Sequence, residues 1–150
     1  MHKNCLSVGE YYCNIYQELM SLLLEKEVDL VLQAHDHTYQ RTRQLATGPS
    51  CTIVKVDSFD DDCVVDDGED NAYTKGAGPV FVITGTAGAD LFDIHPNDPE
   101  AGYFVEWMGR NSDPRKGFTK FTVSSKQISA EFVGSTSTSD FTDSFAIRSQ

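Results

Sequence analysis

Apolar side chains recur at helical spacing near the start of the chain. They fall at i, i+3, i+4, i+7, i+8 and i+11, namely at Tyr12, Ile15, Tyr16, Leu19, Met20 and Leu23. The sequence SVGE at residues 7–10 fits the capping box, in which serine and glutamate side chains satisfy free amide groups at a helix start. The pattern therefore predicts an amphipathic helix that begins after Ser7, buries one face and ends at residues 25–27.

Two short apolar runs predict buried strands, at residues 28–32 and 80–84. Nearly continuous apolar runs are typical of strands in a sheet that is covered on both faces. The second run ends in small residues at 85–89, which permit a close backbone approach or a tight turn. No lysine follows it, so no P-loop is predicted. A helix followed directly by a strand is half of a βαβ unit, and the strand expected before His2 is absent from the sequence.

The remaining segments predict loops and an antiparallel hairpin. Residues 44–78 are polar and rich in aspartate, and they miss the calcium-binding D-x-D-x-D-G pattern, so a solvated loop with one short strand at 52–56 is expected. Residues 91–114 contain three prolines and are expected to be irregular. Residues 117–123 and 127–133 alternate apolar and polar positions around a turn, which predicts a hairpin, and a last strand is expected at 143–148.

Composition limits the classes of partner. The chain has 150 residues, the size of one domain, and a formal net charge of −11, with no cluster of lysine and arginine for binding nucleic acid. No stretch approaches the roughly 20 consecutive apolar residues of a membrane span. An anionic substrate would need a source of positive charge, which bound metal ions can supply.

The four cysteines can be interpreted in two ways, as disulfides or as free thiols, and each implies a different redox compartment. Cys5, Cys13, Cys51 and Cys63 are spaced too widely for CxxC zinc pairs. The sequential pairing Cys5–Cys13 and Cys51–Cys63 is one of three connectivities, and four free thiols are the alternative. Two disulfides would indicate an extracellular or exported protein. Since residues 1–4 contain no apolar signal-peptide core, Met1 would then not be the natural N-terminus.

Candidate chemistry lies directly after the first predicted strand, in the sequence AHDHTYQR at residues 34–41. Loops at the carboxyl ends of strands in an open α/β sheet are where sites form. His35 and His37 can reach toward one place, and neutral imidazole is a common ligand for zinc, iron or manganese. By spacing alone, a metal site and a pair of surface or capping histidines are supported equally.

The wider sequence resembles a known family. His2-Lys3-Asn4, then a helix, then VDLVLQAHDHTYQR at residues 28–41, resembles the last two motifs of the calcineurin-like metallophosphoesterases, and most of all the purple acid phosphatase branch. The resemblance implies an α/β fold of two packed sheets flanked by helices. Residues 1–150 would be its C-terminal portion, ending in an antiparallel hairpin. The implied reaction is hydrolysis of a small-molecule phosphate ester, with two metal ions activating water for in-line attack.

The resemblance also implies roles for individual residues. His2 and His35 match two ligands of one metal, and His37 matches a ligand of the other, with iron paired with zinc or manganese. The motif tail, Tyr39 to Arg41, is expected to hold the loop. Asp36 or a backbone carbonyl is expected to orient the imidazoles by hydrogen bonding. No catalytic or substrate-binding residue is assigned.

Two departures from the family pattern matter. Ala34 replaces the motif glycine, which would cost stability if the backbone there needed a positive φ. The motifs D-x-H, G-D and G-N-H-[DE], which supply the remaining ligands, are missing, so little or no phosphatase activity is expected of this chain alone. The alternative is a non-catalytic, secreted, disulfide-stapled module that binds a metal ion or a protein. The sequence leaves substrate, metal pair and oligomeric state undetermined.

Other polar and aromatic residues are weaker candidates. His95 is expected to be a surface histidine rather than part of a substrate cleft. Asp90 and Asp93 are expected to be solvated rather than linked to a metal. Tyr103 and Trp107 are expected in the core rather than on a binding platform.

Overall fold

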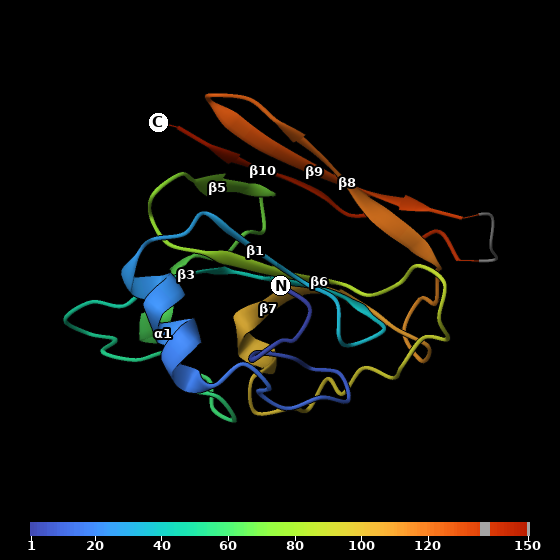
Figure 1. The fold of residues 1–150 in the computed structure, drawn as a ribbon, viewed down its shortest axis with the longest axis horizontal. Coiled ribbons are helices and arrows are strands. Elements are labelled where there is room, and N and C mark those ends of the chain that lie inside the picture. The colour runs from blue at the N-terminus through green and yellow to red at the C-terminus, as the bar shows by residue number, and fades with distance from the viewer. Residues whose placement is uncertain (136–138, 150) are drawn as a thin grey trace.

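The computed structural model describes residues 1–135 and 139–149 and places most of the strands in two packed sheets (Figure 1). The elements in chain order are α1 (Gln17–Glu25), β1 (Leu30–Gln33), β2 (Tyr39–Thr42), β3 (Gln44–Leu45), η1 (Asp61–Cys63), β4 (Val64–Asp66), β5 (Ala72–Thr74), β6 (Val80–Thr84), η2 (Ala101–Tyr103), β7 (Phe104–Met108), β8 (Gly117–Val123), β9 (Gln127–Gly134) and β10 (Ser144–Arg148), where η marks a 3-10 helix. This is the predicted α/β fold with two sheets.

Each sheet has four strands. The first has the order β1-β6-β2-β7, in which β1 and β6 run parallel and the other neighbours are antiparallel. The second has the order β5-β10-β9-β8, in which β5 and β10 run parallel and the predicted β8–β9 hairpin forms one edge. The second sheet lies over one face of the first, and α1 lies on the opposite side (Figure 1). Strands β3 and β4 form a separate short ladder.

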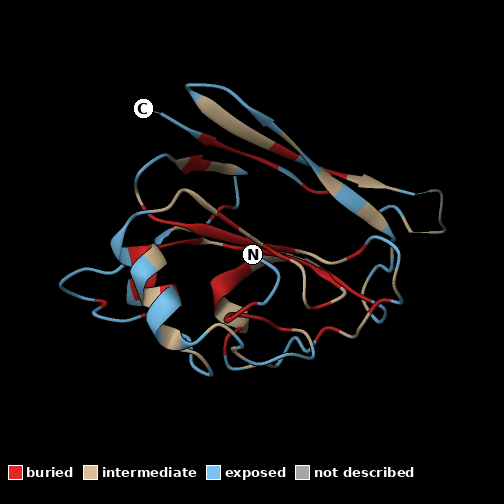
Figure 2. Ribbon diagram, viewed as in Figure 1, coloured by how far each residue is buried: buried red, intermediate tan, exposed pale blue. Residues whose placement is uncertain are grey.

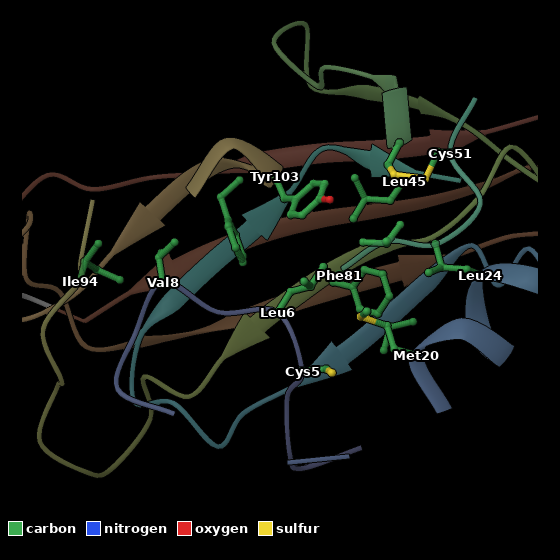
Figure 3. Packing of buried hydrophobic residues seen from close by; sticks show 14 residues of the cluster. Cys5, Leu6, Val8, Met20, Leu24, Leu45, Cys51, Phe81, Ile94 and Tyr103 are labelled. Atoms are coloured by element: carbon green, nitrogen blue, oxygen red, sulfur yellow. A yellow bond between two sulfur atoms is a disulfide. The ribbon is translucent and has the colours of Figure 1, made fainter. Parts of the chain in front are cut away.

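The first sheet separates two hydrophobic cores, and its strands are the most buried part of the fold (Figure 2). Side chains alternate in direction along a strand, so β6 contributes to both cores. Phe81 packs with Met20 and Leu24 of α1 in the first core (Figure 3). Val80 and Val82 pack in the second core, between the two sheets. The nearly continuous apolar run of β6 is thus explained by burial on both faces.

The predicted helix start is wrong. Helix α1 begins at Gln17, and Tyr12 and Tyr16, assigned to its buried face, are 81% and 79% exposed. Cys13, which falls inside the predicted helix, lies instead in a non-helical segment that the Cys5–Cys13 disulfide closes, with the two Cα atoms 3.5 Å apart. A closed loop therefore replaces the first helical turns.

The strand predictions have mixed outcomes. The strands at 28–32 and 80–84, the hairpin and the last strand are confirmed as β1, β6, β8–β9 and β10. The strand at 52–56 is wrong, because these residues form a loop in which the carbonyl of Val54 accepts a hydrogen bond from Gln17. The region 91–114, expected to be irregular, contains β7, which pairs with β2.

Both predicted disulfides are present, Cys5–Cys13 and Cys51–Cys63, and they use all four cysteines. This pairing removes the alternative of four free thiols and agrees with an extracellular protein. Within the described residues, no helix has the length and apolar character needed to cross a membrane.

Candidate metal centre

The loop that carries His35 and His37 joins β1 to β2 and is fixed at both ends by backbone hydrogen bonds. At its start, the amides of Ala34 and His35 both donate to the carbonyl of His2, each at 2.9 Å. At its end, the amide of Gly85 donates to the carbonyl of Thr38 at 3.0 Å. The N-terminal segment and the residue after β6 therefore converge on this one loop.

The backbone at Gly85 packs directly against the backbone of the histidine loop. A Cβ atom there would lie 1.9 Å from the carbonyl oxygen of Asp36, so only glycine fits. This confirms the close backbone approach predicted after the second apolar run. Ala34 is not among the described residues with a positive φ, so replacing the motif glycine causes no backbone strain at this position.

His2 and His35 lie together. The Nε2 atom of His2 is 3.0 Å from the Nδ1 atom of His35. Partial burial lowers the pKa of His35, and the neighbouring His2 lowers it further. A lowered pKa favours the neutral imidazole, which is the form that binds metals.

His37 is held separately. Its Nδ1 atom lies 3.0 Å from the backbone carbonyl of Asp90, which fixes the proton on Nδ1 and leaves Nε2 as the acceptor. A backbone carbonyl thus orients the His37 ring, which is one of the two predicted ways of orienting an imidazole. Among the described residues, no group of three or more His, Cys, Asp or Glu side chains is arranged around one ion position. The structure therefore brings His2 and His35 into contact and adds His37 only as a neighbour.

Asp36 does not orient an imidazole, contrary to the other possibility. It is fully buried, and its carboxylate accepts hydrogen bonds from the Ser7 hydroxyl at 2.5 Å and from the amides of Glu10 and Tyr11 at 2.9 and 3.2 Å. A Cβ atom on Gly9 would lie 2.7 Å from this carboxyl group. Burial raises the pKa of Asp36, against the opposing effect of these hydrogen bonds. The residues expected to form a capping box instead wrap around Asp36.

The motif tail connects the two sheets. Arg41 of β2 is fully buried and forms an ion pair with Asp143, which lies just before β10. The same carboxylate accepts a hydrogen bond from the Tyr39 hydroxyl at 2.6 Å. Gln40 bonds both Thr38 and the amide of Val8. These contacts match the predicted role of holding the loop.

A cavity of about 460 Å³ lies beside Tyr11, and its lining includes none of His2, His35 and His37. Its lining residues are Cys5, Ser7, Gly9, Glu10, Tyr11, Tyr12, Asp57, His95, Asp98 and Glu100. Tyr11 also contacts His35, so it stands between the cavity and the histidine pair. His95 is exposed, as expected of a surface histidine, but it also lines this cavity.

Glu100 is the buried acid of this cavity, and sequence reasoning missed it. Its carboxylate accepts the amides of Ser7 at 2.9 Å and Asp57 at 2.6 Å. Burial raises its pKa to about 7. No sequence signal marked it, because one glutamate between a proline and an alanine is not distinctive.

The weaker candidates have ordinary surroundings. Asp90 and Asp93 form exposed ion pairs with Lys116 and Arg110, which agrees with the expected solvated role of their side chains. Tyr103 is fully buried and Trp107 partly buried against the first core, as predicted.

Comparison with known proteins identifies a solved structure with a similar fold. No protein-family model and no curated protein matches the sequence. The solved structure of the purple acid phosphatase PPD1 from yellow lupin (Lupinus luteus) seeds is similar, with a TM-score of 0.62 and 20% sequence identity. The similarity covers 99% of this chain and 24% of that chain. At this identity the likeness concerns the fold alone: the chain has the mixed α/β fold of the C-terminal part of a purple acid phosphatase.

Proposed function

We propose that this chain supplies the C-terminal ligands of a dinuclear metal centre in a phosphoric ester hydrolase. The observation that carries the proposal is the 3.0 Å approach of His2 Nε2 and His35 Nδ1 in the loop after β1. Metal–nitrogen bonds to histidine are about 2.0–2.1 Å, so two adjacent ligands of one ion lie about 3 Å apart. The pair thus fits two neighbouring positions around a single ion.

His37 would serve the second ion through Nε2, since Asp90 occupies its other nitrogen. We propose iron at this position and zinc or manganese at the first, as the resemblance of the His-x-His motif to the purple acid phosphatases implies. When bound, two such ions neutralise a phosphate group and lower the pKa of a water molecule for in-line attack. The chain's own residues hold the imidazoles in place: the His2 carbonyl accepts the amides that fix the start of the loop, and the Asp90 carbonyl holds the His37 ring.

This ligand set is incomplete. Two ligands for one ion and one for the other leave each ion without a bridging carboxylate, and no other His, Cys, Asp or Glu of the described residues completes either set. Because this chain spans about a quarter of the length of the similar phosphatase, we propose that the other ligands come from a further part of the domain. The chain alone is then expected to bind metal weakly and to have little or no phosphatase activity.

The test compares two forms of the protein. Purify the 150-residue chain and the same chain preceded by its natural upstream coding sequence, load each with iron and zinc or manganese, and assay a chromogenic phosphate monoester. We expect turnover only from the longer form. The variant His35→Ala should abolish it, while His95→Ala, a matched change of an exposed histidine, should not. Robust turnover by the short chain, or an inactive long form, would contradict the proposal.

A second candidate is a secreted, non-catalytic module. The absence of a three-ligand group among the described residues favours it, and the two disulfides agree with export. Under this function, restoring the upstream sequence yields no activity, and calorimetry with zinc detects at most one weakly bound ion that is lost in His2→Ala.

A further inference from the structure

Two aromatic rings lie against two of the candidate ligands. The ring of Tyr11 stacks on the imidazole of His35, with centroids 4.0 Å apart and planes at 27°. The ring of Phe92 stacks on the imidazole of His37, at 4.2 Å and 15°. Tyr11 and Phe92 contact each other edge to face, with centroids 5.8 Å apart. The four rings form one continuous array, from His35 through Tyr11 and Phe92 to His37.

The histidine loop itself holds both aromatic residues in place. The amide of Tyr11 donates to the carboxylate of Asp36, the residue between the two histidines, at 3.2 Å. The amide of Phe92 donates to the carbonyl of His37 at 3.0 Å. The Cys5–Cys13 disulfide closes the loop on which Tyr11 stands. Each ring is therefore fixed to the backbone or side chain of the segment whose imidazoles it covers.

Stacking matters because the imidazole ring otherwise turns freely. The second side-chain torsion of histidine has a broad distribution, so an unsupported ring samples many orientations. A flat aromatic face pressed on one side of the imidazole confines this rotation and leaves the in-plane nitrogens accessible. For His37 the hydrogen bond to Asp90 and the Phe92 ring restrain the same orientation from two directions.

We propose that Tyr11 and Phe92 are positioning residues that hold the imidazoles of His35 and His37 in the orientation for metal binding. This inference rests on the proposed metal centre. Neither aromatic ring offers a ligand at the ion position; each acts through the histidine that it covers. Asp36 accepts the amide of Tyr11 and therefore acts on His35 only through Tyr11.

The test uses two readouts on the 150-residue chain, namely Co²⁺ binding followed by absorption spectroscopy, and the NMR signals of the histidine ring protons in metal-free protein. In Tyr11→Leu we expect Co²⁺ affinity to fall about tenfold, the lower end for loss of an outer-shell partner. The ring-proton signals of His35 should move downfield, since the tyrosine ring current is lost. Tyr11→Phe keeps the ring and should restore both readouts. Phe92→Leu and Phe92→Tyr should affect the His37 signals in the same way.

The matched control is Tyr16→Leu, a change of a tyrosine that is 79% exposed, which should leave both readouts unchanged. Unaltered histidine signals and unaltered affinity in Tyr11→Leu would overturn the inference, and so would equal losses in Tyr11→Phe and Tyr11→Leu. If the wild-type chain binds no Co²⁺, the proposed metal centre fails. The NOE contacts of the His35 ring protons in metal-free wild type and Tyr11→Leu, unlike their chemical shifts, then decide whether the imidazole keeps its orientation without the aromatic ring.

Discussion

The guanidinium group of Arg41 and the carboxylate of Asp143 form a buried bidentate ion pair between residues 102 positions apart in the sequence. Nε of Arg41 lies 2.7 Å from one carboxylate oxygen, and Nη2 lies 2.9 Å from the other. Arg41 also donates to the Asn71 side chain and to the Tyr73 hydroxyl. The interaction joins β2, which follows the histidine loop, to the second sheet.

Removing one partner of this pair should be strongly destabilising. Asp143→Ala leaves the Arg41 charge buried without its counter-ion, and we expect the free energy of unfolding to fall by about 3–5 kcal/mol. Urea unfolding followed by circular dichroism measures the change. The control is Glu131→Ala, which breaks the exposed pair with Lys120 and should cost less than about 0.5 kcal/mol. Equal costs for the two variants would contradict the structural role of Asp143.

Gly85→Ala should destabilise the chain and displace the histidine loop. The added Cβ would meet the carbonyl oxygen of Asp36 at 1.9 Å, and the backbone cannot rotate away as a flexible side chain can. We expect a loss of about 3 kcal/mol in unfolding free energy, at the upper end of overpacking costs, together with weaker Co²⁺ binding. Gly48→Ala is the matched control, because a Cβ there meets nothing within 4 Å. A neutral Gly85→Ala would show that the loop can shift.

Glu100 should make stability depend on pH. Its folded-state pKa of about 7 lies above the unfolded value of about 4.3, so the folded chain binds the extra proton between these values. Its contribution to stability is fully present below about pH 4.3 and is lost as the pH rises through 7. The loss is on the order of 3–4 kcal/mol.

Urea unfolding of the wild type and of Glu100→Gln at pH 5, 6, 7 and 8 measures this contribution. The variant places an amide group opposite one backbone amide and loses a hydrogen bond at every pH, so the comparison concerns the slope and not the absolute stability. Asp36, whose pKa is also raised, contributes equally to both proteins. Parallel pH dependences for the two proteins would show that Glu100 does not titrate in this range.

The disulfides should contribute measurably to stability. Unreduced protein should contain no titratable thiol, because both bonds are formed. Replacing Cys5 and Cys13 together by serine should lower the free energy of unfolding by about 2–3 kcal/mol in the chain-entropy model. The double variant should also release Tyr11, which the ring-proton signals of His35 would report. Four reactive thiols in the native chain would remove the argument for export.

Sequence patterns predicted those elements whose cause is local. Continuous apolar runs predicted β1 and β6, and strict alternation predicted the β8–β9 hairpin. The helix start failed because Ser7 bonds Asp36, 29 positions away, and because the Cys5–Cys13 bond closes the same segment. Strand β7 was missed because the prolines around it outweighed its short apolar pattern.

The site was predictable in part for the same reason. The position of His35 and His37 after a buried strand could be read from the sequence, and so could the structural role of Arg41. The direction of the Asp36 side chain could not, because it depends on amide groups supplied by a loop 25 residues earlier. The stacked rings of Tyr11 and Phe92 left no periodic or motif signal.

Asp36 lies between two glycines, with its side chain against Gly9 and its backbone carbonyl against Gly85. Three positions distant in sequence therefore meet at one residue: what position 36 tolerates depends on position 9, whereas the requirement at position 85 does not depend on the side chain at position 36. Among natural relatives, a residue with a Cβ at position 9 should occur together with a side chain smaller than aspartate at position 36. Position 85 should remain glycine in both groups, because the atom that it faces belongs to the backbone and is the same for every residue at position 36. We therefore expect the residues at positions 9 and 36 to covary and the residue at position 85 to be glycine throughout.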